Sequence, residues 1–210
     1  MTKDSTVGCA EASFADTHRF PSQLKLKIAT HPSHGQMKRP NFQMSGKSFG
    51  SKATTSGQKV IGLISDTHNV IRPQALAALK GVDLIIHAGD IGKPEVLESL
   101  KTIAPLVAIK GNVDKDAWAD SLPETRALKI GDARIYLIHN VNELDFNPAS
   151  RGYRVVISGH SHKPSVVTRD GVLFVNPGSA GPRRFKLPVA LGKLLVDPVD
   201  VRAEIVCLAV

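Results

Sequence analysis

From residue 59 onward, blocks of apolar residues alternate with polar turns, and these blocks predict strands and helices in turn. Three β-branched runs predict buried strands: KVIGLIS at 59–65, DLIIHAG at 83–89 and PLVAIK at 105–110. The segments between them carry apolar residues at helical spacing: PQALAALK at 73–80, with a proline in its first turn, and PEVLESLKTI at 94–103. This βαβαβ order predicts a parallel sheet with right-handed crossovers.

After Trp118 the pattern changes to strands joined by tight turns. TRALKI and ARIYLIH flank the turn Gly131-Asp132 and predict a hairpin, and SVVTR and VLFVN flank Asp170-Gly171. Further strands are expected at RVVIS, near 189–196 and near 199–206. Because helical patterns are scarce in this half, the best architecture is two packed sheets with helices on the outside.

Composition narrows the class of protein. With 210 residues, 42% of them hydrophobic and 22% charged, the chain has room for one globular domain of ordinary size. No apolar stretch approaches the roughly 20 residues needed to cross a bilayer, so no membrane partner is expected. The two cysteines, Cys9 and Cys207, match no metal or disulfide spacing, which favours a cytoplasmic protein.

The net charge of +8 belongs mainly to the N-terminal segment. Residues 1–59 hold nine Lys and Arg against three acids, whereas the rest of the chain holds 18 against 16. Because residues 1–57 lack apolar periodicity, we expect a disordered basic extension, followed by one folded domain at 58–210.

Other interpretations of this extension stay open. Residues 17–59 contain no acid, as in a transit peptide, although Asp4, Glu11 and Asp16 argue against one. Translation can also start later, near Met37 or Met44. A third interpretation is a nucleic-acid-binding arm, but the nearly neutral body of the chain does not favour it.

Polar side chains gather directly after the predicted strands. In α/β sheets, ligands bind outside the carboxyl ends of strands, so these loops can meet at one edge. Four of the five histidines in this part of the chain stand there, whereas His87 lies within a strand and is expected to be a hydrogen-bonded structural group. The strand-end motifs are Asp66-Thr67-His68-Asn69, Gly89-Asp90, Gly111-Asn112, His139-Asn140, Gly159-His160-Ser161-His162 and Asn176-Pro177-Gly178-Ser179.

The residue types in these motifs indicate a metal centre. Imidazoles and carboxylates without thiolates suit Mn²⁺, Fe, Zn²⁺ or Ni²⁺ better than Ca²⁺. Seven candidate ligands are too many for one ion and about right for two ions that share a bridging carboxylate. They are Asp66, His68, Asp90, Asn112, His139, His160 and His162.

The motifs SDTHN, HAGD, GNVD, a histidine after a late strand, GHSH and NPGS occur in an order that resembles the calcineurin-like metallophosphoesterase superfamily. The resemblance spans about residues 60–206, and size and spacing are most similar to the small YfcE-type phosphodiesterases. It implies an α/β (α+β) fold, a four-layer αββα sandwich of two mixed β-sheets flanked by helices. It also implies two divalent metal ions, with Mn first and Fe, Zn, Ni and Mg as alternatives.

By the same resemblance, each candidate ligand has a place. Asp66, His68 and His162 would bind one ion. Asn112, His139 and His160 would bind the other, and Asp90 would bridge the two. Two cations about 3.5–4 Å apart can clamp a phosphate and lower the pKa of a shared water toward about 7.

The resemblance further implies hydrolysis of phosphate esters, most closely of small phosphodiesters. Asn112 can contact a phosphate oxygen through its amide group, and Arg183 and Arg184 are candidate substrate-binding residues. Many relatives carry a histidine that acts as general acid where this chain has Val113. The adjacent Asp114 is therefore a candidate for that role.

Two other function classes compete with this interpretation. One is a non-catalytic interaction module, because a retromer subunit of eukaryotes resembles this fold and serves as a scaffold. The complete set of candidate ligands argues against it. The other is a nuclease that uses the basic extension as an arm. The sequence specifies neither the substrate nor the oligomeric state.

Overall fold

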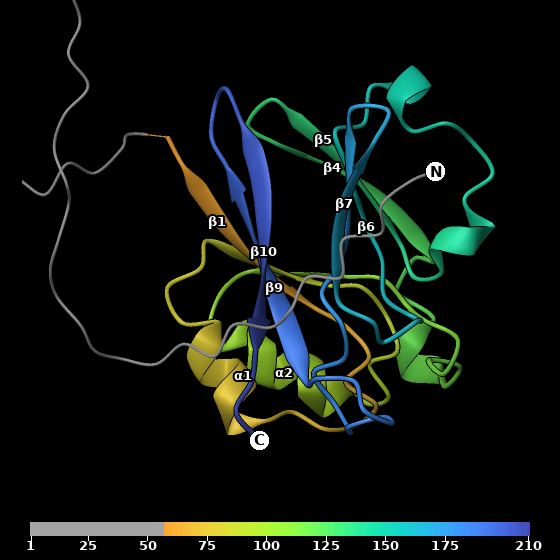
Figure 1. Cartoon of the computed structure of the whole chain (residues 1–210). Coiled ribbons are helices and arrows are strands. Elements are labelled where there is room, and N and C mark those ends of the chain that lie inside the picture. Colours follow the sequence, from red (N-terminus) through yellow and green to blue (C-terminus); the bar gives the residue numbers. More distant parts are fainter. Residues whose placement is uncertain (1–56) are drawn as a thin grey trace, which may run out of the picture. The chain divides into compact units, whose positions relative to one another are not determined.

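The protein is described by a computed structural model over residues 57–210 (Figure 1). Residues 1–56 lie outside the described part, and with them lie Cys9 and almost all of the predicted basic extension. Within residues 57–210 the longest α-helix has eight residues, and none of the helices is long and apolar enough to cross a membrane.

The first sheet has five strands in the order β10-β9-β1-β2-β3. Strands β1, β2 and β3, which come from the first half of the chain, are parallel to one another, as the βαβαβ pattern predicts. Helices α1 and α2 are the crossovers between them. The late strand β9 pairs antiparallel with both β1 and β10. The elements are β1 Lys59–Ile64, α1 Pro73–Ala78, β2 Leu84–His87, α2 Pro94–Lys101, β3 Leu106–Ala108, β9 Ala190–Val196 and β10 Val201–Cys207.

The second sheet also has five strands, in the order β4-β5-β6-β8-β7. Both predicted turns join antiparallel neighbours, β4 with β5 and β7 with β8, while β5, β6 and β8 run parallel. The sheets are therefore both mixed, which confirms the predicted architecture. The strands are β4 Thr125–Ile130, β5 Ala133–Ile138, β6 Val155–Ile157, β7 Ser165–Arg169 and β8 Val172–Asn176.

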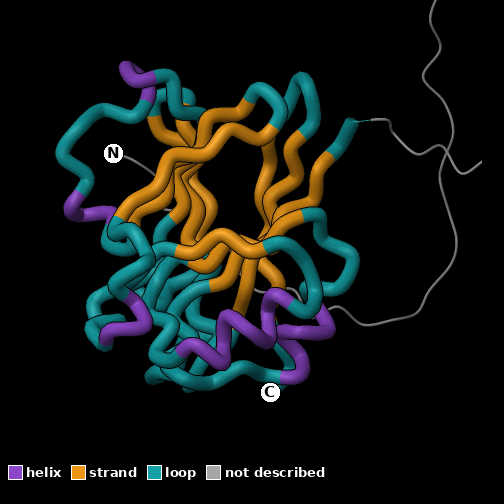
Figure 2. The backbone as a smooth tube through the Cα atoms, turned by 180° about the vertical axis from the view of Figure 1, so that it is seen from behind, coloured by secondary structure: helices purple, strands orange, loops and turns teal. Residues whose placement is uncertain are grey.

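The main core lies between the two sheets. Successive side chains of a strand point to opposite faces, so Ile61 and Leu63 of β1 face the second sheet, where Ile135 and Leu137 of β5 meet them. Ile64 of β1 faces the helices instead. Figure 2 shows the strands as facing sheets with helices and loops outside them. The central strands of the first sheet are covered by the second sheet on one face and by helices on the other. The edge at their carboxyl ends is therefore held in place from both sides.

The outer layers of the two sheets differ. The two α-helices cover the first sheet, whereas the second is covered by residues 141–154, which form only two short 3₁₀ turns, η2 Val141–Glu143 and η3 Ala149–Arg151. A small apolar cluster around Ile138, Val156 and Val172 lies beneath these turns. This segment is short and contains Pro148, so the fourth layer is thin.

Candidate metal centre

The loops after the central strands of both sheets meet at one edge of the molecule. Backbone hydrogen bonds join the loop after β1 to the loop after β2, from Asp66 N–H to the Gly89 carbonyl and from His68 N–H to the Asp90 carbonyl, both at 3.0 Å. A backbone bond of 2.9 Å likewise joins Gly159 to His139 in the second sheet. The predicted convergence of the strand ends is therefore present.

A first cluster of ligand atoms consists of Asp66, His68 and His162, which all lie within 4.8 Å of one another. The His162 Nε2 atom is 3.4 Å from Asp66 Oδ1 and 3.3 Å from His68 Nε2. The two imidazole rings are stacked, with centroids 5.1 Å apart. Three lone-pair atoms thus converge on one point, which suits a cation.

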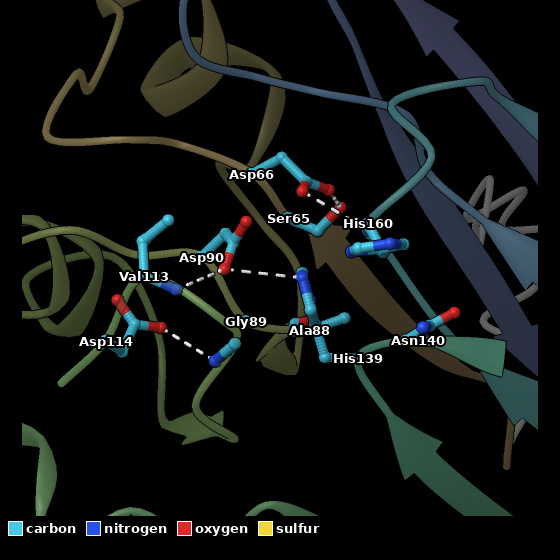
Figure 3. A network of polar contacts seen from close by, with 12 residues as sticks. Ser65, Asp66, Ala88, Gly89, Asp90, Val113, Asp114, His139, Asn140 and His160 are labelled. Carbon is cyan, nitrogen blue, oxygen red and sulfur yellow. Dashed lines mark hydrogen bonds and ion pairs between the residues drawn. The ribbon is translucent and has the colours of Figure 1, made fainter. Parts of the chain in front are cut away.

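A second cluster consists of Asp66, Asp90 and His139. Asp90 lies between the two halves of the site, because its Oδ1 is 3.3 Å from His139 Nε2 and its Oδ2 is 3.7 Å from His68 Nε2. Figure 3 shows Asp90 between His139 and the backbone N–H of Val113, which donates to Oδ1 at 3.1 Å. Each carboxylate oxygen of Asp90 therefore faces a different histidine.

The tautomer of His139 is set by its backbone contact. Its Nδ1 is 2.7 Å from the Ala88 carbonyl, which can only accept, so Nδ1 carries a proton. The buried Nε2 has no hydrogen-bond partner among the described residues and faces the Asp90 carboxylate. Burial acts to lower the pKa of His139, but Asp90 and the Ala88 carbonyl outweigh it and raise that pKa, so a proton on Nε2 can face the carboxylate in the metal-free site. A divalent cation would replace that proton on binding. The donor set therefore fits divalent metal ions.

Ionisation in the metal-free site follows from burial and neighbouring charges. Burial raises the pKa of Asp66 to about 6, against a hydrogen bond of 2.6 Å from the Ser65 hydroxyl. Burial acts in the same direction on Asp90, but the His139 imidazole and the Val113 N–H outweigh it and lower its pKa to about 2. Burial, aided by Arg184, lowers the pKa of His162 to about 4 and also lowers that of His68. Both histidines are therefore neutral at pH 7, the form that binds metal.

The backbone is strained at most of the candidate ligands. Positive φ angles occur at five of them: Asp66 (53°), His68 (45°), Asp90 (56°), His160 (66°) and His162 (57°). This left-handed conformation costs about 1–2 kcal/mol for a residue with a Cβ atom. Such strain clusters at functional sites, where the surrounding structure stabilises it.

Two glycines leave room for these side chains. Gly89 has φ +94°, and a Cβ atom there would lie 2.6 Å from His139 Nδ1. A Cβ atom on Gly111 would overlap Asp90 Oδ1 and the Asp90 backbone nitrogen. Any larger residue at either position would displace a candidate ligand.

The other two candidate ligands are more exposed. Asn112 lies on the loop after β3 and lines a cleft together with His139. His160 donates its backbone N–H to Asp66 Oδ1 at 3.2 Å, and its exposed ring meets His139 edge to face, with centroids 5.4 Å apart. Within residues 57–210, the His160 imidazole does not join either cluster of ligand atoms.

Asp114, the candidate acid, is buried and fully engaged by backbone donors. Its Oδ2 accepts from Ile91 N–H at 3.1 Å and from Gly111 N–H at 2.8 Å, and its Oδ1 accepts from Gly92 N–H at 2.8 Å. The carboxylate thereby ties the loop after β2 to the loop after β3. This placement favours a structural role, because both oxygens are already occupied by backbone donors of two loops.

The two candidate substrate-binding arginines occupy one exposed loop but differ in position. Arg184 Nη2 is 3.5 Å from His68 Nε2, at the edge of the first cluster. Arg183 is exposed on the same loop. The loop is anchored by Arg72, whose guanidinium donates twice to the Gly181 carbonyl, at 3.2 and 3.1 Å.

His87 confirms the prediction of a structural histidine. It is fully buried, its Nε2 lies 3.0 Å from the Thr67 hydroxyl, and its Nδ1 accepts from Gly89 N–H at 3.2 Å. Burial lowers its pKa to about 3, so the ring is neutral. It supports the loop that carries Asp66 and His68.

Sequence reasoning assigned no role to two supporting residues, Ser65 and Asn176, although Asn176 was noted as the first residue of a strand-end motif. The Ser65 hydroxyl is 2.6 Å from Asp66 Oδ2 and 2.8 Å from the Gly178 carbonyl, which links the loops after β1 and β8. The buried Asn176 donates to the Gly159 carbonyl at 2.6 Å and so holds the loop that carries the two histidines of SGHSH. The signal available in the sequence was a polar residue at the last position of an otherwise apolar strand.

Comparison with known proteins gives consistent matches. Residues 60–197 match the calcineurin-like phosphoesterase superfamily domain. A probable metallophosphoesterase of Methanothermobacter thermautotrophicus is 34% identical over 159 residues, an alignment that covers 70% of this chain and 91% of that protein.

Solved structures also resemble the described fold. A structure reported as a novel archaeal phosphodiesterase has a TM-score of 0.59 and 25% identity, with 70% of this chain and 99% of the other covered. Vacuolar protein sorting 29 from Cryptosporidium parvum has a TM-score of 0.64 and 20% identity, with 73% and 93% covered. The second likeness shows the shared fold alone.

Proposed function

Because the chain belongs to the calcineurin-like phosphoesterase superfamily, we propose that it hydrolyses phosphodiesters at a centre of two divalent metal ions. Site one would use Asp66, His68 and His162, and site two would use Asn112, His139 and His160. Asp90 would bridge them. The observation that carries this proposal is that the two clusters adjoin: Asp66 belongs to both, and the two oxygens of Asp90 face His139 and His68.

The donor set supports Mn²⁺ as the first choice, with Fe, Zn²⁺, Ni²⁺ and Mg²⁺ as alternatives, since it combines imidazole, carboxylate and amide oxygen without thiolate. When bound, two such ions neutralise phosphate charge and lower the pKa of the attacking water. The protein's own residues would supply orientation and charge around that chemistry.

Each of these residues would act at a stated atom. The Asn112 side-chain oxygen would hold an ion while its NH₂ group donates to a phosphate oxygen. Arg184, beside His68, would neutralise a second phosphate oxygen. Asp114 would keep the loop of Asn112 in register with Asp90 through its three backbone bonds. No protonated side chain is assigned to the leaving group, because Val113 occupies the position of the general acid in many relatives.

A non-catalytic scaffold is the competing function for this fold. The observations that disfavour it are the buried, unpartnered His139 Nε2 and the strain at five ligand positions. Metal binding would give these arrangements a purpose, because it places a cation between His139 and Asp90 and uses the strained loops to hold its ligands. The test is metal analysis of the purified protein together with hydrolysis of bis(p-nitrophenyl) phosphate and p-nitrophenyl phosphate.

The expected result is close to two ions per chain after loading with Mn²⁺, and faster hydrolysis of the diester than of the monoester. Metal content near zero with no turnover of either ester would favour the scaffold. Faster hydrolysis of the monoester would retain the metal centre and replace the phosphodiesterase with a phosphatase.

A further inference from the structure

A cleft of about 710 Å³ opens directly beside the candidate metal centre. It lies between the loop after β3, the hairpin β4–β5 and the 3₁₀ turn η2. Asn112 and His139, two proposed ligands of site two, belong to its lining. His139 is buried, so it forms part of the wall of the cleft on the side of the metal centre.

The remaining lining of the cleft is acidic. Four exposed carboxylates face two lysines, a surplus of two negative charges: Asp120, Glu124, Glu143 and Asp145 against Lys110 and Lys115. Lys110 is already paired with Glu124 at 3.5 Å. Within residues 57–210, the carboxylates of Asp120, Glu143 and Asp145 form no ion pair with a Lys or Arg side chain. We name this feature the acidic cleft.

One of these carboxylates is held in place beside the metal centre. The Asn140 side chain donates to Glu143 Oε1 at 2.9 Å, and its own Oδ1 accepts from Asn142 N–H at 3.1 Å, which caps η2. Asn140 directly follows His139, so the position of Glu143 is fixed relative to site two. A solvated surface acid would need no such bond.

The cleft also presents an aromatic face. Tyr136 of β5 lines it. Its ring packs edge to face against Phe146, with centroids 5.0 Å apart, and lies tilted against Tyr153, with centroids 5.2 Å apart. These neighbours fix the orientation of the Tyr136 ring. Aromatic rings and carboxylates together attract cations, and quaternary ammonium groups in particular.

A positively charged loop lies beside the first cluster of ligand atoms. Arg183, Arg184 and Lys186 belong to the loop beside His68, whereas the acidic cleft lies beside His139. A phosphodiester bound at the ions would therefore meet cations beside His68 and carboxylates beside His139. Coulomb interactions with these carboxylates would distinguish an ester group that carries a charge from a neutral one.

We propose that the acidic cleft binds one alcohol group of the substrate and selects phosphodiesters in which that group carries a positive charge, such as an amino- or ammonium-alkyl ester. This inference rests on the proposed function for the position of the phosphate, and it adds the class of substrate. Polyanions such as nucleic acids are disfavoured, because the chain beyond the phosphate would face the carboxylates.

The experiment compares two p-nitrophenyl phosphodiesters that differ only in charge, the choline ester and its carbon isostere, the neohexyl ester. With the Mn²⁺-loaded full chain at low salt, kcat/KM for the choline ester should exceed that for the neohexyl ester by about tenfold. The ratio should fall as salt rises, because the carboxylates are exposed. In Glu143→Gln/Asp145→Asn it should fall to about twofold or less, since those two carboxylates line the cleft beside η2, which directly follows His139 and Asn140.

The matched control is Asp132→Asn, which removes an exposed carboxylate in the β4–β5 turn outside the cleft. It should leave the choline-to-neohexyl ratio unchanged. A ratio near one in the wild type, with both esters hydrolysed, overturns the cationic substrate class and leaves the phosphodiesterase intact. An equal loss of the ratio in the control would also overturn it, because net charge rather than the cleft would then be responsible.

Binding separates this inference from the proposed function. Calorimetry with phosphocholine and neohexyl phosphate measures the same charge difference without turnover. Tighter binding of phosphocholine, lost in Glu143→Gln/Asp145→Asn, supports the acidic cleft even if no ester is hydrolysed, in which case only the hydrolase proposal fails. Equal binding of the two monoesters overturns the cleft.

Discussion

The two proposed metal sites are built differently, although Asp90 would bridge them. In site one Asp66 and His162 are buried, and their ligand atoms already lie close to that of His68. In site two only His139 is buried, while Asn112 and His160 are exposed. The proposed first site is therefore the more buried of the two, and we expect metal binding to order the two exposed side chains proposed for the second. Substrate access is expected at site two, because a ligand on an exposed loop leaves the ion open to the acidic cleft.

The largest expected effect comes from the residue that joins the two sites. Asp90→Asn removes the bridging charge that both sites share, so bound metal should fall to one ion or fewer per chain and kcat should fall by at least about 10³-fold. Metal content and hydrolysis of bis(p-nitrophenyl) phosphate measure these outcomes. Circular dichroism should show an intact fold. Near-normal turnover with full metal content would remove the two-metal proposal.

The next variant is at Val113, which follows the exposed ligand Asn112 of proposed site two. Valine cannot protonate a leaving alkoxide, so aryl phosphodiesters should be cleaved far faster than alkyl ones in the wild type. Val113 is 47% exposed and its N–H donates to Asp90. Val113→His should therefore raise kcat/KM for an alkyl ester by about 10²-fold, the lower range for a positioned acid.

Val113→Gln is the matched control, since it is polar and exposed but does not titrate. The slope of log kcat/KM against leaving-group pKa, over a series of substituted phenyl esters, gives the same answer independently. A flat slope in the wild type, with chemistry rate-limiting, would mean that another group already supplies the proton. Asp114→Asn would then be the next variant to examine.

The stability of the metal-free protein should depend on pH because of the buried residue His87. Its pKa is about 3 in the folded protein and 6.5 in a model peptide, so below pH 6.5 the unfolded chain binds the additional proton. Stability of the metal-free protein should therefore fall as pH drops, by about 2 kcal/mol between pH 6.5 and about pH 5 from this residue. Urea unfolding at each pH in the presence of a chelator measures the loss.

His87→Gln retains a donor for Thr67 and an acceptor for Gly89 but cannot be protonated in this range. Its free energy of unfolding should be lower at pH 7 and change less between pH 6.5 and about pH 5. Parallel curves for the two proteins would show that His87 is not the group that titrates. Asp66 acts in the opposite direction: its raised pKa makes no difference to stability below the ordinary value of 3.8, and the cost to the metal-free fold grows as pH rises from there to about 6 and is complete above it.

The smallest expected effect is the difference in affinity between the sites. Ordering two exposed side chains costs about 1–2 kcal/mol, which is about tenfold in affinity. Calorimetric titration of the metal-free protein with Mn²⁺ should therefore resolve a tighter and a weaker step. His160→Ala should abolish the weaker step alone, and His162→Ala should abolish the tighter one. Two equal steps, or loss of the same step in both variants, would contradict the comparison.

The strands and the strand-end motifs were predictable because they are encoded locally. A β-branched run such as KVIGLI forms a buried strand wherever it packs, and the parallel order follows from the crossovers. The position of polar motifs at the carboxyl ends of strands is then sufficient to predict that Asp66, Asp90 and His139 lie together, as they do. His87 was separable from the other histidines for the same reason, since it lies inside its strand.

The positions of individual side chains were not predictable, because they depend on residues far away in the chain. Asp114 suggested an acid from its place beside Val113, yet its carboxylate accepts backbone bonds from residues as much as 23 positions away. Arg183 and Arg184 are adjacent residues of the same type, so the sequence does not show which of them lies at the site. Only the path of their loop brings Arg184 to His68, 116 residues away. Local pattern carries no information about such pairings.

By itself, the sequence determined the two-sheet architecture and the set of groups at the carboxyl ends of the strands, because period-two patterning and turn residues act over a few positions. Only the tertiary structure decided that Asp90 faces one histidine with each oxygen, that site one is buried and site two is open, and that Glu143 and Asp145 line a cleft beside His139. Those relations arise where the two sheets pack together, and the electrostatic energy between the side chains there depends on distances that chain order does not specify.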